Sequence, residues 1–181
     1  MSRTCVGRSL AVAVLASALV AFAPPSGAGA GERRPLRIRV ADTAGMAVRR
    51  AVLAARERLG AARCREVLAD FRTQPPERPL TAVLDELGRT PEEHLDTLLF
   101  ADGSRRPPCA SPAILAFTSP GGDTVHVCAS QFRSAVRSDP AYAEMVLIHE
   151  LLHTLGLGEN PPTSLEITAR VREGCGDVAR R

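Results

Sequence analysis

Periodic apolar positions predict the elements of the first half of the chain. Residues 36–40 alternate apolar and charged side chains, which is the pattern of a half-exposed β-strand. From Met46 to Phe71 apolar residues recur at intervals of three and four, which predicts a helix that bends or breaks near Gly60. Thr90-Pro91-Glu92-Glu93 combines an N-cap, a proline at the first helical position and a glutamate at the third. We therefore expect a capped helix that continues through Phe100.

The second half of the chain predicts a β-hairpin followed by two helices. Residues 113–118 and 124–128 are short strand-like runs, joined by a turn that contains a proline and two glycines. Asp139 can cap, and Pro140 can begin, a helix that continues to about Leu155. A last helix is expected over residues 164–173. Together these elements predict one small α+β domain with a mixed, mainly antiparallel sheet.

The first thirty residues have the features of a secretory signal peptide. Arg3 and Arg8 precede an apolar run over residues 10–23, and Ala28-Gly29-Ala30 forms an A-x-A cleavage site. The apolar run is too short for a stable membrane-spanning helix, and an uncleaved anchor is the alternative. We expect a signal peptide over residues 1–30 and a mature domain over residues 31–181. That domain would be secreted or periplasmic and, after cleavage, free of the membrane.

The charge balance excludes some classes of partner. The chain has 23 basic and 20 acidic residues and a net charge of +3, and removal of Arg3 and Arg8 with the signal leaves +1. Proteins that bind nucleic acids through their surface carry a much stronger basic excess. Aromatic residues make up only 3% of the chain, too few for a platform that stacks single-stranded bases. We expect a monomer that binds no nucleic acid.

Four cysteines remain in the predicted mature domain, because Cys5 precedes the apolar run and leaves with the signal. In an exported chain four cysteines suggest two disulfides, with three possible connectivities. Cys109 and Cys128 flank the predicted hairpin, so we prefer that pair, which leaves Cys64 to bond with Cys175. No two of these cysteines have the C-x-x-C spacing of a zinc ribbon or a redox motif.

The clearest chemical motif lies inside the helix predicted before Leu155. His149 and His153 are four residues apart, so both imidazoles lie on one face of the helix and can bind one zinc ion. Glu150 follows the first histidine and can act as general base toward a water on the open zinc position. In a chain of this composition H-E-x-x-H would occur by chance with a frequency of roughly 0.6%. Two hydrogen-bonded histidines within an apolar helix are the alternative.

The residues that follow complete a longer motif. Gly156 can adopt a positive φ and end the helix, and Glu159 comes six residues after His153. The string H-E-x-x-H-x-x-G-x-x-E, which begins at His149, resembles the extended zinc-binding motif of the metzincin metallopeptidases and matches its first four defined positions. Glu159 stands where metzincins usually have histidine. No methionine follows Met145 to form their methionine turn.

The resemblance implies a zincin-like domain that uses one catalytic zinc ion to hydrolyse peptide bonds in a peptide or protein substrate. It implies that His149, His153 and Glu159 bind the metal, since a carboxylate is a competent third zinc ligand. Glu150 would be the catalytic base. It also implies an antiparallel edge strand that binds substrate near the active-site helix, and the hairpin containing His126 is the candidate.

Four other residues are weaker candidates. Glu166 is the alternative third ligand, in the position of the helix glutamate of gluzincins, but it also forms a capping box with Thr163. Tyr142 lies on nearly the same helical face as the motif and is either a border of the cleft or a packed core residue. We expect His94 to be a solvated helix residue and His126 to be a strand residue outside the metal site.

Two other functions stay open at the level of the sequence. One is a zinc hydrolase that acts on a non-protein amide, such as a cell-wall bond. The other is a non-catalytic secreted binding protein, held by disulfides, in which zinc is structural or absent. The sequence favours a secreted zinc metallopeptidase over both.

Overall fold

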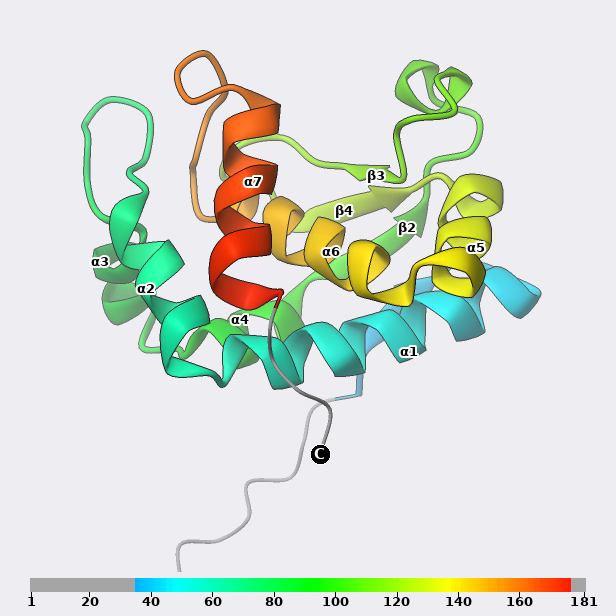
Figure 1. Cartoon of the computed structure of the whole chain (residues 1–181), viewed down its shortest axis with the longest axis horizontal. Coiled ribbons are helices and arrows are strands. Elements are labelled where there is room, and N and C mark those ends of the chain that lie inside the picture. The colour runs from blue at the N-terminus through cyan, green and yellow to red at the C-terminus, as the bar shows by residue number, and fades with distance from the viewer. Residues whose placement is uncertain (1–34, 177–181) are drawn as a thin grey trace, which may run out of the picture. The chain divides into compact units, whose positions relative to one another are not determined.

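The computed structural model describes residues 35–176 of the chain (Figure 1). This part of the chain is α+β, as predicted, with seven α-helices and one four-stranded mixed sheet. The predicted signal peptide over residues 1–30 lies outside the described residues. In chain order the elements are β1 (Arg37–Arg39), α1 (Asp42–Leu59), α2 (Ala62–Asp70), α3 (Leu80–Leu87), α4 (Pro91–Thr97), β2 (Leu99–Asp102), the 3₁₀ helix η1 (Pro107–Ala110), β3 (Ala116–Phe117), β4 (Thr124–Val127), α5 (Ala129–Ser138), α6 (Pro140–Thr154) and α7 (Ser164–Cys175).

The sheet is mainly parallel, so the prediction of a mainly antiparallel sheet is wrong. Its strand order is β1-β2-β4-β3, and only the β3–β4 pair, the predicted hairpin, is antiparallel. β1 and β2 run the same way because four helices, and not a tight turn, connect them, and the segment with η1 and β3 between β2 and β4 allows β4 to run in the same direction. The hairpin prediction is confirmed, with Phe117 opposite His126.

The predicted helix from Thr90 to Phe100 is also wrong over its last three residues. Its start is confirmed, because Thr90 and Glu93 form a full capping box, but α4 ends at Thr97. The next residues form β2, in which Phe100 pairs with both β1 and β4 and is fully buried. Two ladders of hydrogen bonds and the burial of the Phe100 ring favour a strand over residues 99–102. These interactions join residues that are distant along the chain, so the local sequence pattern does not reveal them.

Helix α6 packs in front of the sheet and contacts α1, α5 and α7 (Figure 1). It begins at Pro140, where the Asp139 carboxylate accepts a hydrogen bond from the Tyr142 amide, so the predicted cap is confirmed. Four of its apolar residues, Leu147, Ile148, Leu151 and Leu152, are fully buried. Within residues 35–176, none of the helices combines the length and the apolar character needed to span a bilayer.

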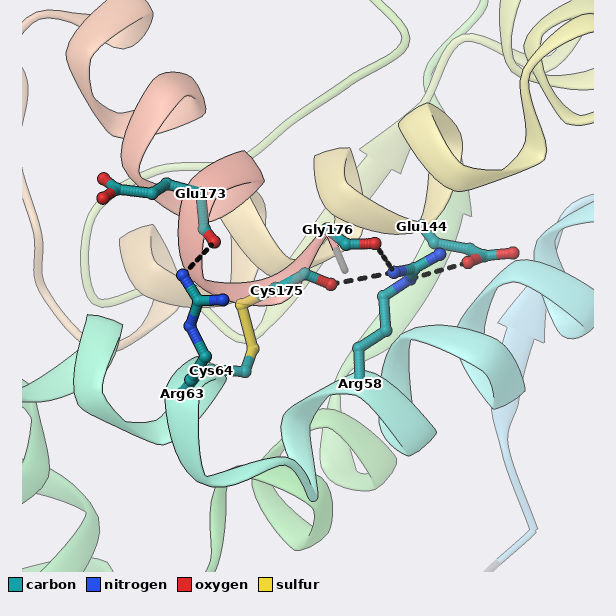
Figure 2. Close-up of a disulfide and its surroundings, with 7 residues drawn as sticks. All are labelled: Arg58, Arg63, Cys64, Glu144, Glu173, Cys175 and Gly176. Atoms are coloured by element: carbon teal, nitrogen blue, oxygen red, sulfur yellow. Dashed lines mark hydrogen bonds and ion pairs between the residues drawn. A yellow bond between two sulfur atoms is a disulfide. The ribbon is translucent and has the colours of Figure 1, made fainter. Parts of the chain in front are cut away.

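Two disulfides are present, with the preferred connectivity. Cys109–Cys128 joins η1 to the end of β4, and Cys64–Cys175 joins α2 to the end of α7. Figure 2 shows that Arg58 of α1 reaches the same end of α7. There it donates to the backbone carbonyl of Cys175 at 2.8 Å, and it also donates to the carboxylate of Glu144 on α6 at 2.8 Å. These bonds hold α1, α6 and α7 together.

Candidate metal centre

Helix α6 brings His149 and His153 together on one face. They lie one turn apart, with their Nε2 atoms separated by 3.0 Å and their ring centroids by 4.8 Å. Both side chains are buried, at 7% and 6% exposure. The spacing of four residues in the sequence therefore produces the predicted pair of imidazoles.

A turn after α6 returns the chain to these histidines. Gly156 has φ of +100° and its amide donates to the His153 carbonyl, which ends the helix. The Gln74 backbone amide donates to the Gly156 carbonyl at 3.0 Å, and the flexible end of the Gln74 side chain lies against Gly158. Glu159 follows this turn and lies back beside α6.

The Glu159 carboxylate completes a three-residue group. Its Oε1 lies 3.4 Å from His153 Nε2 and 3.9 Å from His149 Nε2. A tetrahedral zinc ion with ligands at about 2.0–2.1 Å would separate two ligand atoms by about 3.3 Å. The three observed separations, 3.0, 3.4 and 3.9 Å, scatter around that value. The group of His149, His153 and Glu159 could therefore hold a metal ion.

The far nitrogens of both imidazoles have partners that orient the rings. His153 Nδ1 lies 2.7 Å from the Leu157 carbonyl, which can only accept, so Nδ1 carries the proton and Nε2 presents its lone pair to the group. His149 Nδ1 lies 3.1 Å from Thr168 Oγ1 on α7, a hydroxyl that can accept in the same way. Such outer contacts fix the tautomer that a metal ligand needs. Thr168 carries no sequence signal for this role, since only the packing of α7 on α6 brings it there.

Burial also shapes the protonation of the site. Burial, and then the neighbouring His153, lowers the pKa of His149 to about 4, which leaves its imidazole neutral at neutral pH. Glu150 is 6% exposed, and burial followed by the charge of Glu159 raises the pKa of its carboxyl to about 8. A hydrogen bond from the Thr118 backbone amide, just beyond β3, acts in the opposite direction. Within residues 35–176, Glu150 Oε2 is buried and has no hydrogen-bond partner.

The alternative third ligand, Glu166, lies apart from the group. Its carboxylate accepts hydrogen bonds at 2.8 Å from the Thr163 amide and the Thr163 hydroxyl, so it serves as the capping-box glutamate of α7. These hydrogen bonds lower the pKa of the Glu166 carboxyl. Among the described residues, the His/Cys/Asp/Glu group arranged to hold a metal contains Glu159 and not Glu166.

The remaining candidates lie outside the metal group. Tyr142 is half-buried and packs against the hydrophobic core. His126 lies on the inner strand β4, and its ring centroid is 5.1 Å from that of Phe117 on β3. The edge strand of the hairpin is therefore β3 and not the strand that carries His126. His94 is not the solvated residue that we expected. It is 6% exposed, and its Nε2 lies 3.0 Å from the hydroxyl of Thr154 at the end of α6.

Comparison with family models, with curated proteins and with solved structures finds no match to this chain. Function must therefore be inferred from the chemistry of the site itself: two oriented imidazoles and a carboxylate around one point, with a second, buried carboxyl group beside them.

Proposed function

We propose that this protein is an exported zinc metallopeptidase. The observation that carries the proposal is the triangle formed by His149 Nε2, His153 Nε2 and Glu159 Oε1, whose sides match the ligand separations of tetrahedral zinc. A catalytic zinc site has three protein ligands and an open position, and this group offers three. The two disulfides are compatible with a secreted or periplasmic location.

The donor set favours zinc among the common metals. Imidazole nitrogens suit zinc, copper, iron and nickel, whereas magnesium and calcium prefer sites made only of oxygen ligands. A set of two histidines and one glutamate is found in catalytic zinc sites, and the partners of the two Nδ1 atoms hold both Nε2 lone pairs toward one point. When bound there, zinc would polarise the substrate carbonyl and acidify a water molecule.

Glu150 is the residue that would move the proton. It follows His149 on α6, and its Oε2 has no hydrogen-bond partner within residues 35–176. The Thr118 amide donates to the same carboxylate, which orients it. A zinc cation bound beside Glu150 would favour its ionised form and so oppose the burial that raises its pKa to about 8. We propose that the ionised Glu150 takes the proton of the attacking water and delivers it to the leaving nitrogen of the peptide bond. The Glu150 carboxylate is thereby regenerated at the end of the cycle.

Metal analysis tests the binding half of the proposal. The purified chain, dialysed against buffer that contains zinc, should hold about one zinc ion per molecule by atomic emission. Glu159→Ala should lose most of this zinc. The matched control Glu166→Ala should retain it, because Glu166 only caps α7. Loss of zinc in the Glu166 variant with retention in the Glu159 variant would overturn the ligand assignment.

Hydrolysis tests the catalytic half. A quenched fluorescent peptide library should be cleaved by the zinc-loaded chain, and Glu150→Gln should bind zinc normally but lose cleavage by about 100-fold or more. Full activity in Glu150→Gln would contradict the mechanism. Zinc binding without cleavage of any peptide, together with release of amine from a cell-wall amide, would instead identify a hydrolase of non-protein amides.

A further inference from the structure

A groove that shares no residue with the metal centre runs between the first half of α1 and α5, which pack side by side (Figure 1). It has a volume of about 510 Å³ and continues along α1 into a second hollow of about 340 Å³, with Met46 and Arg50 common to both. We call the two together the arginine groove. It is lined by Thr43, Met46, Ala47, Arg49, Arg50, Leu53, Ala54, Glu57, Arg133 and Arg137.

The charge of the arginine groove is concentrated. Its lining contains four arginines and one glutamate, a net charge of +3, whereas the whole of residues 31–181 carries only +1. Among the described residues, no carboxylate forms an ion pair with Arg50, Arg133 or Arg137. Arg133 instead donates to the Thr43 hydroxyl at 3.1 Å, which holds its guanidinium across the groove from α5 to α1. These guanidinium groups can therefore accept an anionic partner.

The groove also has an apolar component. Met46 is 66% exposed and Leu53 is 48% exposed, which makes them two of the largest apolar side chains left on the surface. Met46, Arg50 and Leu53 follow one another at intervals of four and three, so they share one face of α1. The groove thus alternates apolar and cationic positions along its length. A partner that fits it carries both carboxylates and apolar side chains.

The dimensions favour a polypeptide segment over a single ion. From Thr43 to Glu57 the helix axis rises about 21 Å, which equals about six residues of extended chain. Arginine binds carboxylates through paired N–H groups, so acidic side chains along such a segment would engage Arg50, Arg133 and Arg137 in turn.

Other occupants fit less well. The parts of this chain outside residues 35–176 are themselves basic: residues 1–34 contain four arginines and one glutamate. A second copy docked through the same face by two-fold symmetry would place arginines against arginines. A bilayer is flat, whereas these side chains line a hollow between two helices.

We infer that the arginine groove binds an extended acidic segment of a partner protein, whose carboxylates pair with Arg50, Arg133 and Arg137 and whose apolar side chains cover Met46 and Leu53. This inference does not depend on the proposed zinc chemistry.

The test uses fluorescence anisotropy with a fluorescein-labelled peptide of alternating glutamate and leucine residues and the full mature chain. We expect saturable binding that weakens as salt is added. The triple variant Arg50→Ala, Arg133→Ala, Arg137→Ala should bind roughly tenfold more weakly, because three exposed ion pairs each contribute a few-fold. The matched control replaces three exposed arginines elsewhere, Arg72, Arg105 and Arg172, and should bind as the wild type does.

Absence of peptide binding at low salt would overturn the inference, and so would an equal weakening in both triple variants. Undiminished binding of a peptide in which serine replaces leucine would also overturn it. So would binding to phosphatidylglycerol vesicles but not to the peptide, if the triple variant of Arg50, Arg133 and Arg137 lost the vesicle binding. The last result would identify a lipid surface in place of a protein segment. Zinc content, measured on the same samples, should be equal in all three proteins.

Discussion

Arg58 is buried where three helices meet, and replacing it with methionine tests how the domain supports its metal centre. The side chain is 6% exposed and makes three hydrogen bonds of 2.8 Å, to the Glu144 carboxylate and to the backbone carbonyls of Cys175 and Gly176 (Figure 2). Arg58→Met removes one partner of a buried ion pair, which typically costs about 3–5 kcal/mol of unfolding free energy. We expect a loss near 4 kcal/mol.

A double variant distinguishes charge burial from lost packing. In Arg58→Met with Glu144→Leu no buried carboxylate loses its cation, so the cost of an unpaired buried charge is absent, while the cost of the two carbonyls that lose a donor remains. The double variant should therefore be more stable than Arg58→Met alone. The exposed counterpart on the same helix, Arg56, pairs with Asp96 at 3.0 Å with 31% of its side chain exposed, and Arg56→Met should cost about 1 kcal/mol or less.

Urea unfolding followed by circular dichroism, with the disulfides intact, measures all four proteins by linear extrapolation. A double variant that is no more stable than Arg58→Met alone would contradict this account, since the carboxylate would then not depend on the guanidinium. A loss in Arg58→Met no larger than that in Arg56→Met would also refute it, since burial would then add nothing to the pair.

Three further predictions concern pH, the outer contact of the site and a disulfide. Burial, and then Arg89, lowers the pKa of His94 to about 4 from 6.5, so between these pH values the unfolded chain binds a proton that the folded chain does not. The free energy of unfolding should be highest above pH 6.5 and should fall as the pH decreases toward 4. In urea titrations at several pH values, His94→Leu should remove up to ~3 kcal/mol of that fall. A variant in which stability depends on pH as steeply as in the wild type would contradict this prediction. Thr168→Val should weaken zinc binding by about tenfold or more, measured in competition with a chelating dye, and Thr168→Ser should recover the affinity. Equal zinc affinities for the wild type and the valine variant would show that the hydrogen bond between Thr168 and His149 does not support the site. Replacing Cys64 and Cys175 with alanine opens a loop of 111 residues and should cost about 5 kcal/mol in urea unfolding, and a loss under about 1 kcal/mol would show that this bond constrains little.

Local signals in the sequence predicted several elements correctly. Thr90 with Glu93, and Asp139 with Pro140, mark helix starts that the structure confirms, because a cap needs only side chains within three residues of the first turn. The break near Gly60 separates α1 from α2 as expected. Such features depend on neighbours along the chain, so a sequence is sufficient to predict them.

Elements whose conformation depends on distant partners were missed. Residues 99–102 were expected to be helical as far as Phe100, yet they form β2 because strands on both sides supply hydrogen bonds and bury that ring. The direction of the sheet was missed for the same reason. Helices α3 and α5 were not predicted, since neither has a side-chain N-cap that marks its start.

At the candidate site, the sequence is sufficient to place His149 and His153 on one face of α6, because helical spacing alone brings residues four apart together. It also determined, through Gly156, that the chain turns after the helix. The position of Glu159, and not Glu166, beside those histidines became evident from the folded chain, in which a local cap holds Glu166 elsewhere. The contacts of Thr168 with His149 and of Thr118 with Glu150 likewise depend on α7 and the β3 edge packing against α6. No spacing along the chain encodes these contacts, because they join residues from separate elements.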